Sequence, residues 1–398
     1  MENTEKDLIR EQYQEIEDKI RKYNPGANFD RLRDAYLFAR EAHKEQKRKD
    51  GSPYITHPLA AAEIIADMEL DEDSVIACIL HDTVEDTPVT HEDIAKRFGR
   101  ADAPALCGES WEVSAHPDGM SVVEGGPFDG RDLASLCEEF GAALVGSFAE
   151  GTRFPLLVKL IDAKKRLSLQ VHPDDEGAAR HGGEAKTEMW YFLDAPAGAT
   201  VCAGLKDGVG PRIFADAVRE RQVSALLRAV DAEPGKALYI PGGLVHAICE
   251  GCFVLEVQQS SNTTWRVYDW DRLGPDGRPR ELHVARAMEV IDWKAPAASL
   301  SVPYAMKAAD PRNKRERVVR SDYFTMERYA LAAPEPFDLD GRSFRVLFAL
   351  RGALLVRDGD RETRVPEGRS CLLPAALGPC SVAPADPAAG AAFLSTEL

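Results

Sequence analysis

The glycine content and the spacing of apolar residues change near residue 100, and this change constrains the fold more than any other feature. Of the 30 glycines, only Gly26, Gly51 and Gly99 fall in the first hundred residues, where apolar residues recur at helical spacing. Further on, short stretches of alternating apolar and polar residues are punctuated by Gly, Pro and Asp, as is typical of strands and turns. The sequence therefore predicts a helical segment followed by a mainly β segment.

The length predicts more than one domain. A chain of 398 residues exceeds what one hydrophobic core usually serves. In the helical segment Pro58 can open an alanine-rich helix, and Asp73 can cap the next one. The β segment carries one apparent helical insert at residues 214–231. The domains that we predict are residues 1–99, 100–296 and 297–398.

The composition excludes several classes of protein. A net charge of −17 argues against a nucleic-acid surface. No run of about 18 apolar residues is present, and the first residues are acidic and polar, so we expect neither a membrane span nor a signal peptide. Eight scattered cysteines suit reduced thiols, and Cys249 and Cys252 form only an isolated C-x-x-C. We expect a cytoplasmic protein, and the sequence does not fix its oligomeric state.

Four polar side chains on predicted strands form a candidate metal site. Gln170 and His172 share one face of the strand in LSLQVHPDD, and Glu188 lies in KTEMWYFLD. His246 follows a Pro-Gly-Gly turn in GKALYIPGGLVHAI. A lone strand histidine is more often a surface or packed core residue, and a solvated edge would explain the first strand. Together, however, these nitrogen and oxygen donors suit zinc or another divalent ion inside a small antiparallel, cupin-like barrel.

Five segments then carry a specific resemblance over about residues 102–398. Residues 108–123, 154–175, 186–195, 239–248 and 254–272 resemble, in the right order, the type I mannose-6-phosphate isomerases. The resemblance implies jelly-roll-like cupin barrels and interconversion of mannose 6-phosphate and fructose 6-phosphate, with a sugar phosphate as the small-molecule partner. It also implies one zinc ion per chain, with the ligands Gln170, His172, Glu188 and His246.

The same resemblance assigns roles to further residues. It makes Arg266 and Lys186 catalytic cations and Glu256 the candidate base, while Ser168, Lys159 and Lys186 line the substrate pocket. Other interpretations stay open for three of them. Glu256 could orient His246 instead, Lys159 could be a surface lysine, and Arg266 could form an ordinary salt bridge.

The first 99 residues resemble a different family, the stringent-response enzymes that make and degrade guanosine tetraphosphate. EAHKEQKRKDGSPYITHPLAAAEII and ACILHDTVEDT are similar to the start of their HD hydrolase domain. The resemblance implies that His57, His81 and Asp82 are manganese ligands. It also implies that Glu85 and Asp86 are catalytic acids and that Arg48 and Lys49 contact the nucleotide.

The HD resemblance is truncated. In that family a later helix with the sequence Asp-Arg-Leu-His-Asn supplies a fourth metal ligand. In this sequence the similarity to the isomerases begins before such a helix could occur. The partial similarity to the motif around Asp162 is a coincidence. We therefore interpret the HD site as vestigial and expect no manganese there. The isomerase part in turn lacks the opening strand with a Trp-Gly-Gly turn that its family carries. The join, at residues 96–111, is either a natural fusion or a product of recombination or assembly.

Three functions compete on the sequence alone. The first is a zinc-dependent mannose-6-phosphate isomerase, and the second is a guanosine tetraphosphate pyrophosphohydrolase. The third is a sugar-binding cupin without catalysis, against which Arg266 and Lys186 argue.

Overall fold

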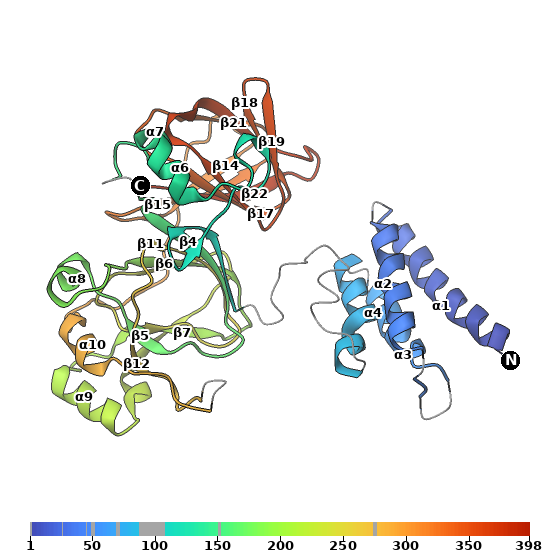
Figure 1. The fold of residues 1–398 in the computed structure, drawn as a ribbon, viewed down its shortest axis with the longest axis horizontal. Coiled ribbons are helices and arrows are strands. Elements are labelled where there is room, and N and C mark those ends of the chain that lie inside the picture. The colour runs from blue at the N-terminus through green and yellow to red at the C-terminus, as the bar shows by residue number, and fades with distance from the viewer. Residues whose placement is uncertain are drawn as a thin grey trace. The chain divides into compact units, whose positions relative to one another are not determined.

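The computed structural model describes residues 2–25, 27–44, 46–48, 52–68, 72–86, 108–149, 153–273 and 277–398. The chain divides into two compact units, residues 1–107 and residues 108–398. In the described residues the first unit is helical and the second is mainly β (Figure 1), which confirms the predicted change of structure. The domain boundaries expected at residues 99 and 296 stay predictions.

The first unit packs its helices around an aliphatic core. These helices are α1 (Glu2–Tyr23), α2 (Phe29–Ala42), α3 (Thr56–Asp67) and α4 (Glu72–Asp86). Ile16, Leu32 and Ile79 are fully or almost fully buried in this core. Pro58 lies in the first turn of α3, where its missing N–H costs nothing. Asp73 is the second residue of α4 and does not precede the helix, so the prediction that it caps α4 was wrong.

Two five-stranded antiparallel sheets form the first barrel of the second unit. The order in one sheet is β1 (Glu109–Val113), β4 (Leu156–Asp162), β11 (Phe253–Gln259), β6 (Glu188–Asp194) and β9 (Ala237–Ile240). The order in the other is β12 (Trp265–Tyr268), β5 (Leu169–Val171), β10 (His246–Ala247), β7 (Thr200–Leu205) and β8 (Leu227–Asp231). Ile161, Trp190 and Phe192 of the first sheet share a core with Val201 and Ala203 of the second, so the two inner faces pack on each other.

Short helices cover the outer face of the β12–β8 sheet. α9 (Pro211–Arg219) and α10 (Val284–Val290) contribute buried residues to the core on this face, and α8 (Asp175–His181) packs against α10 (Figure 1). The predicted helical insert at residues 214–231 was wrong in its second half. Arg221 takes a positive φ of 58°, which ends the helix, and the chain continues through η2 (Val223–Leu226) into β8, which pairs with β7.

A second β-sandwich is built from the C-terminal residues. Its larger sheet has the order β13 (Tyr304–Met306), β14 (Lys314–Arg320), β15 (Thr325–Leu331), β22 (Ala391–Glu397), β17 (Arg345–Arg351) and β20 (Ser370–Leu373). The smaller has the order β16 (Glu335–Leu339), β21 (Gly378–Pro384), β18 (Leu354–Asp358) and β19 (Arg361–Val365). Leu347 and Phe393 of the larger sheet pack with Val356 and Val382 of the smaller one.

The two sandwiches share a further core. Val158 and Met189, on the outer face of the β1–β9 sheet, belong to the same buried cluster as Met326 and Val346 of the larger C-terminal sheet. The short elements β2 (Ala115–His116), α6 (Leu133–Phe140) and α7 (Ala142–Val145) add buried residues to this core. The other short elements of the unit are β3 (Gly119–Met120), η1 (Gly126–Phe128) and η3 (Ala375–Leu377). The outer face of the β1–β9 sheet is thus covered by the second sandwich.

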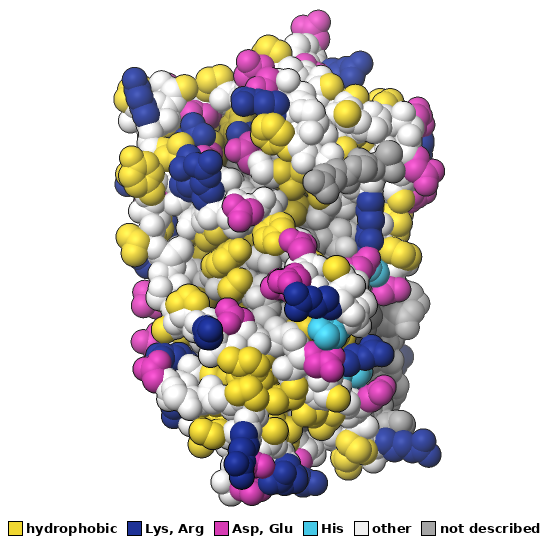
Figure 2. All heavy atoms as spheres, turned by 90° about the vertical axis from the view of Figure 1, so that its left-hand side faces the viewer, with side chains coloured by type: hydrophobic (Ala, Val, Ile, Leu, Met, Phe, Trp, Pro, Cys, Tyr) yellow, Lys and Arg dark blue, Asp and Glu magenta, His cyan; other side chains and the backbone are white. Residues whose placement is uncertain are grey.

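Two surface properties bear on function. Among the described residues, no helix combines the length and the apolar character that crossing a membrane requires. On the face drawn in Figure 2, basic and acidic side chains are interspersed across the surface. On this face, therefore, the described side chains form no extended region of positive charge that could attract a phosphate group.

Candidate metal centre and active site

Strand register places three of the predicted site residues on one face. His246 of β10 lies opposite Gln170 of β5, and Arg266 of β12 lies opposite the same Gln170. Directly opposed residues in an antiparallel pair point to the same side of the sheet. Their neighbours Val171, Trp265 and Ala247 face the outer core instead. The polar face of this sheet therefore points into the barrel, and Glu188, on β6 of the other sheet, points into the same interior.

A glycine turn brings His246 beside His172. The backbone N–H of Gly243 donates to the carbonyl oxygen of His172 at 2.8 Å. A Cβ atom on Gly242 would lie 2.6 Å from the Cα atom of Asp174, closer than real Cβ contacts come. The Pro-Gly-Gly turn is required because a side chain here would push these two segments apart.

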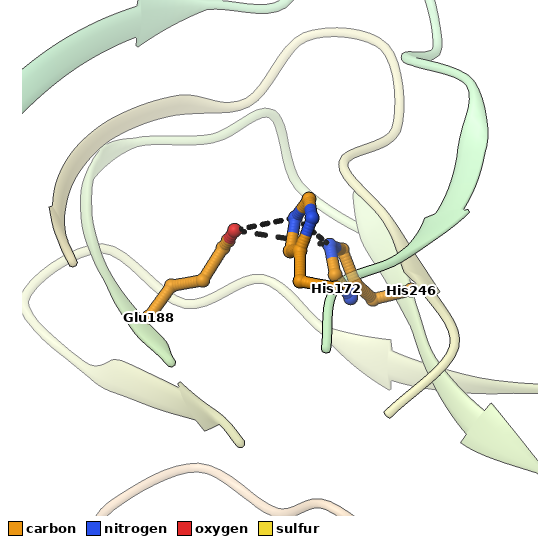
Figure 3. A group of neighbouring side chains, drawn as sticks. All are labelled: His172, Glu188 and His246. Carbon is orange, nitrogen blue, oxygen red and sulfur yellow. Dashed lines mark hydrogen bonds and ion pairs between the residues drawn. The ribbon is translucent and has the colours of Figure 1, made fainter. Parts of the chain in front are cut away.

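Three of the predicted metal ligands meet in one buried cluster. The ligand atoms of His172, Glu188 and His246 all lie within 4.8 Å of one another, and the side chains point toward one another in Figure 3. The Nε2 atoms of the two histidines are 3.2 Å apart, and Glu188 Oε1 lies 2.7 Å from His172 Nε2 and 4.0 Å from His246 Nε2. Bonds of about 2.0–2.1 Å at tetrahedral angles would separate zinc ligands by about 3.3 Å. The cluster has the dimensions of a zinc site.

The protonation states also suit a metal. His246 Nδ1 lies 2.8 Å from the carbonyl oxygen of Leu244, which can only accept, so Nδ1 carries the proton and Nε2 keeps its lone pair. Burial and then Lys186 lower the pKa of His172 to about 3, and burial lowers the pKa of His246. Burial alone would raise the pKa of Glu188, but the charge of Lys186, whose Nζ lies 2.8 Å from Glu188 Oε1, holds it well below its usual range. Neutral imidazoles and an ionised carboxylate are the forms that bind metals.

The fourth predicted ligand, Gln170, borders the same cluster. Its Nε2 atom lies 3.4 Å from His246 Nε2, and its Oε1 atom is 3.4 Å from Ser168 Oγ. The oxygen and nitrogen of an amide are interchangeable by a half turn, which would direct the oxygen to the cluster. Gln170 is thus positioned to be an oxygen ligand.

A second carboxyl group lies deeper in the β1–β9 sheet. Glu256 is buried, and Trp190 Nε1 donates to its Oε2 at 2.9 Å. Burial, followed by the charge of Glu188, raises the pKa of Glu256 to about 7. Because His246 Nδ1 bonds to Leu244 and not to Glu256, the interpretation that Glu256 orients His246 was wrong.

Two lysines lie beside the carboxylates, and a third cation, Arg266 of β12, lies opposite Gln170. Lys186 Nζ lies 2.8 Å from Glu188 Oε1 and 3.3 Å from His172 Nε2. Lys159 Nζ lies 3.9 Å from Glu256 Oε1, and the side chain is only 6% exposed, so the surface-lysine interpretation was wrong. Arg266 donates through Nη1 to the carbonyl oxygen of Glu281 at 2.8 Å, and its buried Nε has no hydrogen-bond partner among the described residues.

Two aromatic residues at the site were missed by the sequence reasoning. Trp190 follows Glu188 by two residues on the same strand, and this spacing could have placed its indole beside the carboxylate. Trp111 of β1 lies opposite Lys159, whose Nζ is 4.5 Å from the ring centroid. Because β6 is buried on both faces along most of its length, a tryptophan at position 190 is easily interpreted as core packing.

The predicted HD residues are described only in part. His57 Nε2 lies 3.5 Å from Asp82 Oδ2, and Tyr54 donates to the same oxygen at 3.2 Å. The backbone N–H of Arg48 donates to the carbonyl oxygen of Ser52. The side chains of His81, Glu85 and Asp86, all on α4, lie outside the described part of the chain, as does the whole of Lys49.

Comparison with family models separates the chain in the way the motifs do. Residues 89–195 match the phosphomannose isomerase type I catalytic domain, and residues 314–384 match the mannose-6-phosphate isomerase cupin domain. Residues 35–104 match the HD domain model, which overlaps the first of these at its end. Both predicted resemblances are confirmed.

Individual relatives agree with the models. The chain is 34% identical over 305 residues to the putative mannose-6-phosphate isomerase YvyI of Bacillus subtilis, covering 73% of this chain and 92% of that protein. The crystal structure of a mannose 6-phosphate isomerase from Bacillus subtilis matches with a TM-score of 0.68 and 31% identity, covering 78% of this chain and 95% of that one. The bifunctional (p)ppGpp synthase/hydrolase SpoT of Escherichia coli is 45% identical over 98 residues, which are 25% of this chain and only 14% of that protein.

Proposed function

This chain belongs to the mannose-6-phosphate isomerase family, and we propose that it interconverts mannose 6-phosphate and fructose 6-phosphate with one zinc ion, held by Gln170, His172, Glu188 and His246. The observation that carries the proposal is the buried meeting of two neutral imidazoles and an ionised carboxylate at zinc-like spacing. Nitrogen and oxygen donors without a thiolate suit zinc and leave room for a further oxygen ligand.

The reaction moves a proton between neighbouring carbons. A base removes the proton beside the carbonyl group, an enediol forms, and the proton returns to the adjacent carbon. A bound zinc ion would supply positive charge close to the sugar oxygens, on which negative charge develops. The remaining tasks belong to side chains of this chain.

Glu256 is our candidate for the base. A base works best when its pKa lies near the working pH, and the pKa of Glu256 is raised to about 7 by burial and by Glu188. Lys159 and Lys186, both buried beside the carboxylates, keep cationic charge where the sugar oxygens would lie. Ser168 is buried next to Gln170 and can contribute a hydroxyl group to the pocket.

Arg266 is the candidate for contact with the substrate from the β12 side. Burial, and then Arg280, lower the pKa of Arg266, but a guanidinium group stays charged at neutral pH. Its Nε is buried and has no partner among the described residues, so a small opening on this side of the site would free a donor for an oxygen of the sugar phosphate.

A coupled assay on the full chain tests the function. With mannose 6-phosphate as substrate, we expect formation of fructose 6-phosphate that a chelator abolishes and added zinc restores. Metal-free protein should lose nearly all turnover because a metal contributes several kcal/mol to stabilising charge in the transition state, on the order of 1,000-fold in rate. Zinc and sugar phosphate binding without turnover would contradict the proposal and favour a sugar-binding cupin.

The helical unit offers a control reaction. We propose that it makes no active hydrolase, because the match covers only 14% of SpoT and the sequence lacks the later Asp-Arg-Leu-His-Asn segment. The same preparation, given guanosine tetraphosphate and manganese, should release no pyrophosphate. Release that disappears in Asp82→Ala would assign a second activity to the chain.

A further inference from the structure

Trp190 lies between the two carboxyl groups of the site. Its indole Nε1 donates to Glu188 Oε2 at 2.8 Å and to Glu256 Oε2 at 2.9 Å. The side chain is fully buried, and its ring meets the His246 ring edge-on with centroids 5.4 Å apart. One buried N–H group thus serves a metal-ligand candidate and the base candidate together.

The strand register produces this arrangement. Trp190 follows Glu188 by two residues on β6, so both side chains point to the inner face. On the neighbouring strand β11, Glu256 lies directly opposite Trp190. Glu188 on the same strand and Glu256 on the neighbouring strand therefore both lie beside the indole nitrogen of Trp190.

The hydrogen bond fixes which oxygen of Glu188 faces the histidines. With Oε2 bound to the indole, Oε1 is directed to within 2.7 Å of His172 Nε2. The terminal torsion of a glutamate has a broad preference, so rotamer energetics alone do not hold a carboxylate in one orientation. A partner on the non-ligand oxygen is the usual means of fixing a metal-binding carboxylate.

We propose that Trp190 is a positioning residue, which holds Glu188 in its metal-binding orientation and keeps the carboxyl group of Glu256 beside it. This inference rests on the proposed function, because it requires a metal ion at His172, Glu188 and His246. It adds a role for a side chain that contacts neither the ion nor the substrate but orients two groups that do.

The test is metal binding by the full-length Trp190→Phe protein. Phenylalanine keeps an aromatic ring but removes the N–H group. We expect zinc affinity, measured by competition with a chromogenic chelator, to fall about 10- to 100-fold, as for other partners of metal ligands. The visible spectrum of the cobalt-loaded protein should change. We also expect kcat to fall while KM changes little, because the variant misorients the two carboxyl groups and leaves substrate binding intact.

Trp265→Phe is the matched control. Trp265 is also buried, but it lies on the outer face of the other sheet, in the core formed with Leu169 and Val171. Its replacement should lower thermal stability and leave zinc affinity and the cobalt spectrum unchanged. If Trp190→Phe also leaves both unchanged while the unmodified chain binds zinc and turns over, the inference is wrong and the proposed function stands. If the unmodified chain binds no zinc, the proposed function itself fails.

A second route avoids the loss of ring volume if Trp190→Phe does not fold. All five tryptophans can be replaced biosynthetically by the benzothiophene analogue, which keeps the ring shape and has sulfur in place of the N–H group. Trp111 donates to Glu109 and Trp270 to the carbonyl oxygen of Leu167, so Trp111→Phe and Trp270→Phe measure what these two donors contribute. Weaker zinc binding beyond their contribution supports the inference, and unchanged binding overturns it.

Discussion

His246→Ala is expected to abolish zinc-dependent isomerisation. The substitution removes one of the two imidazole ligands, whose Nε2 atoms are 3.2 Å apart in a cluster fully shielded from solvent. The loss of the charge stabilisation that a metal provides should reduce kcat/KM by at least about 1,000-fold, equivalent to about 4 kcal/mol. The coupled assay measures the rate, and metal analysis after dialysis should show that zinc no longer co-purifies with the protein.

His181→Ala controls for the removal of a histidine as such. His181 lies on α8, partly exposed, and its Nδ1 is 2.8 Å from Glu289 Oε2. Its replacement should leave both turnover and zinc content unchanged. Zinc-dependent turnover that persists in His246→Ala would remove this histidine from the metal centre.

Glu256→Gln is expected to separate catalysis from metal binding. The amide keeps the shape of the side chain but cannot take up a proton, and a positioned general base typically contributes about 100- to 10,000-fold to the rate. We therefore expect kcat to be reduced by a factor in that range. The zinc content should stay normal because Glu256 is not a member of the ligand cluster. Steady-state kinetics of the zinc-loaded variant measure this.

A matched control for burial is Glu327→Gln in the second sandwich. Glu327 is as buried as Glu256, but it is held by Arg315 and Tyr329. This variant should lose stability and keep full turnover. If Glu256→Gln retains near-normal kcat, another group is the base; if it loses zinc instead, Glu256 acts mainly by supporting the ligands.

Much of the site could be predicted because strand periodicity is a local property. Gln170 and His172 alternate with Leu169 and Val171, whose side chains are fully buried in the outer core, so the polar face was fixed by the sequence. The Pro-Gly-Gly turn before His246 likewise marked a tight approach that the contact between Gly242 and Asp174 explains.

Other features depend on partners that are distant in sequence. β6 is buried along most of its length on both faces, so its pattern could not show that Trp190 faces Glu256 of β11. The helical insert was predicted too long because Arg221 ends α9 with a positive φ, which sequence assigns mainly to Gly or Asn. β8 is then held in extended form by its pairing with β7.

The similarity to the HD domain gives way to the similarity to the isomerases near residue 100, where the sequence pattern also changes. The HD model ends at residue 104, and the isomerase catalytic model begins at residue 89, so both extend into the predicted join at residues 96–111. Residues 87–107 lie outside the described part of the structure. The account of the isomerase depends only on residues in the second unit.

The most direct test of the account is to locate zinc in crystals of the zinc-loaded protein by anomalous scattering on either side of the zinc absorption edge. We predict a single peak bounded by Gln170, His172, Glu188 and His246, at about 2.0–2.2 Å from the ligand atoms. A peak bound by other residues, or a fully active protein with no zinc at these four side chains, would contradict the account.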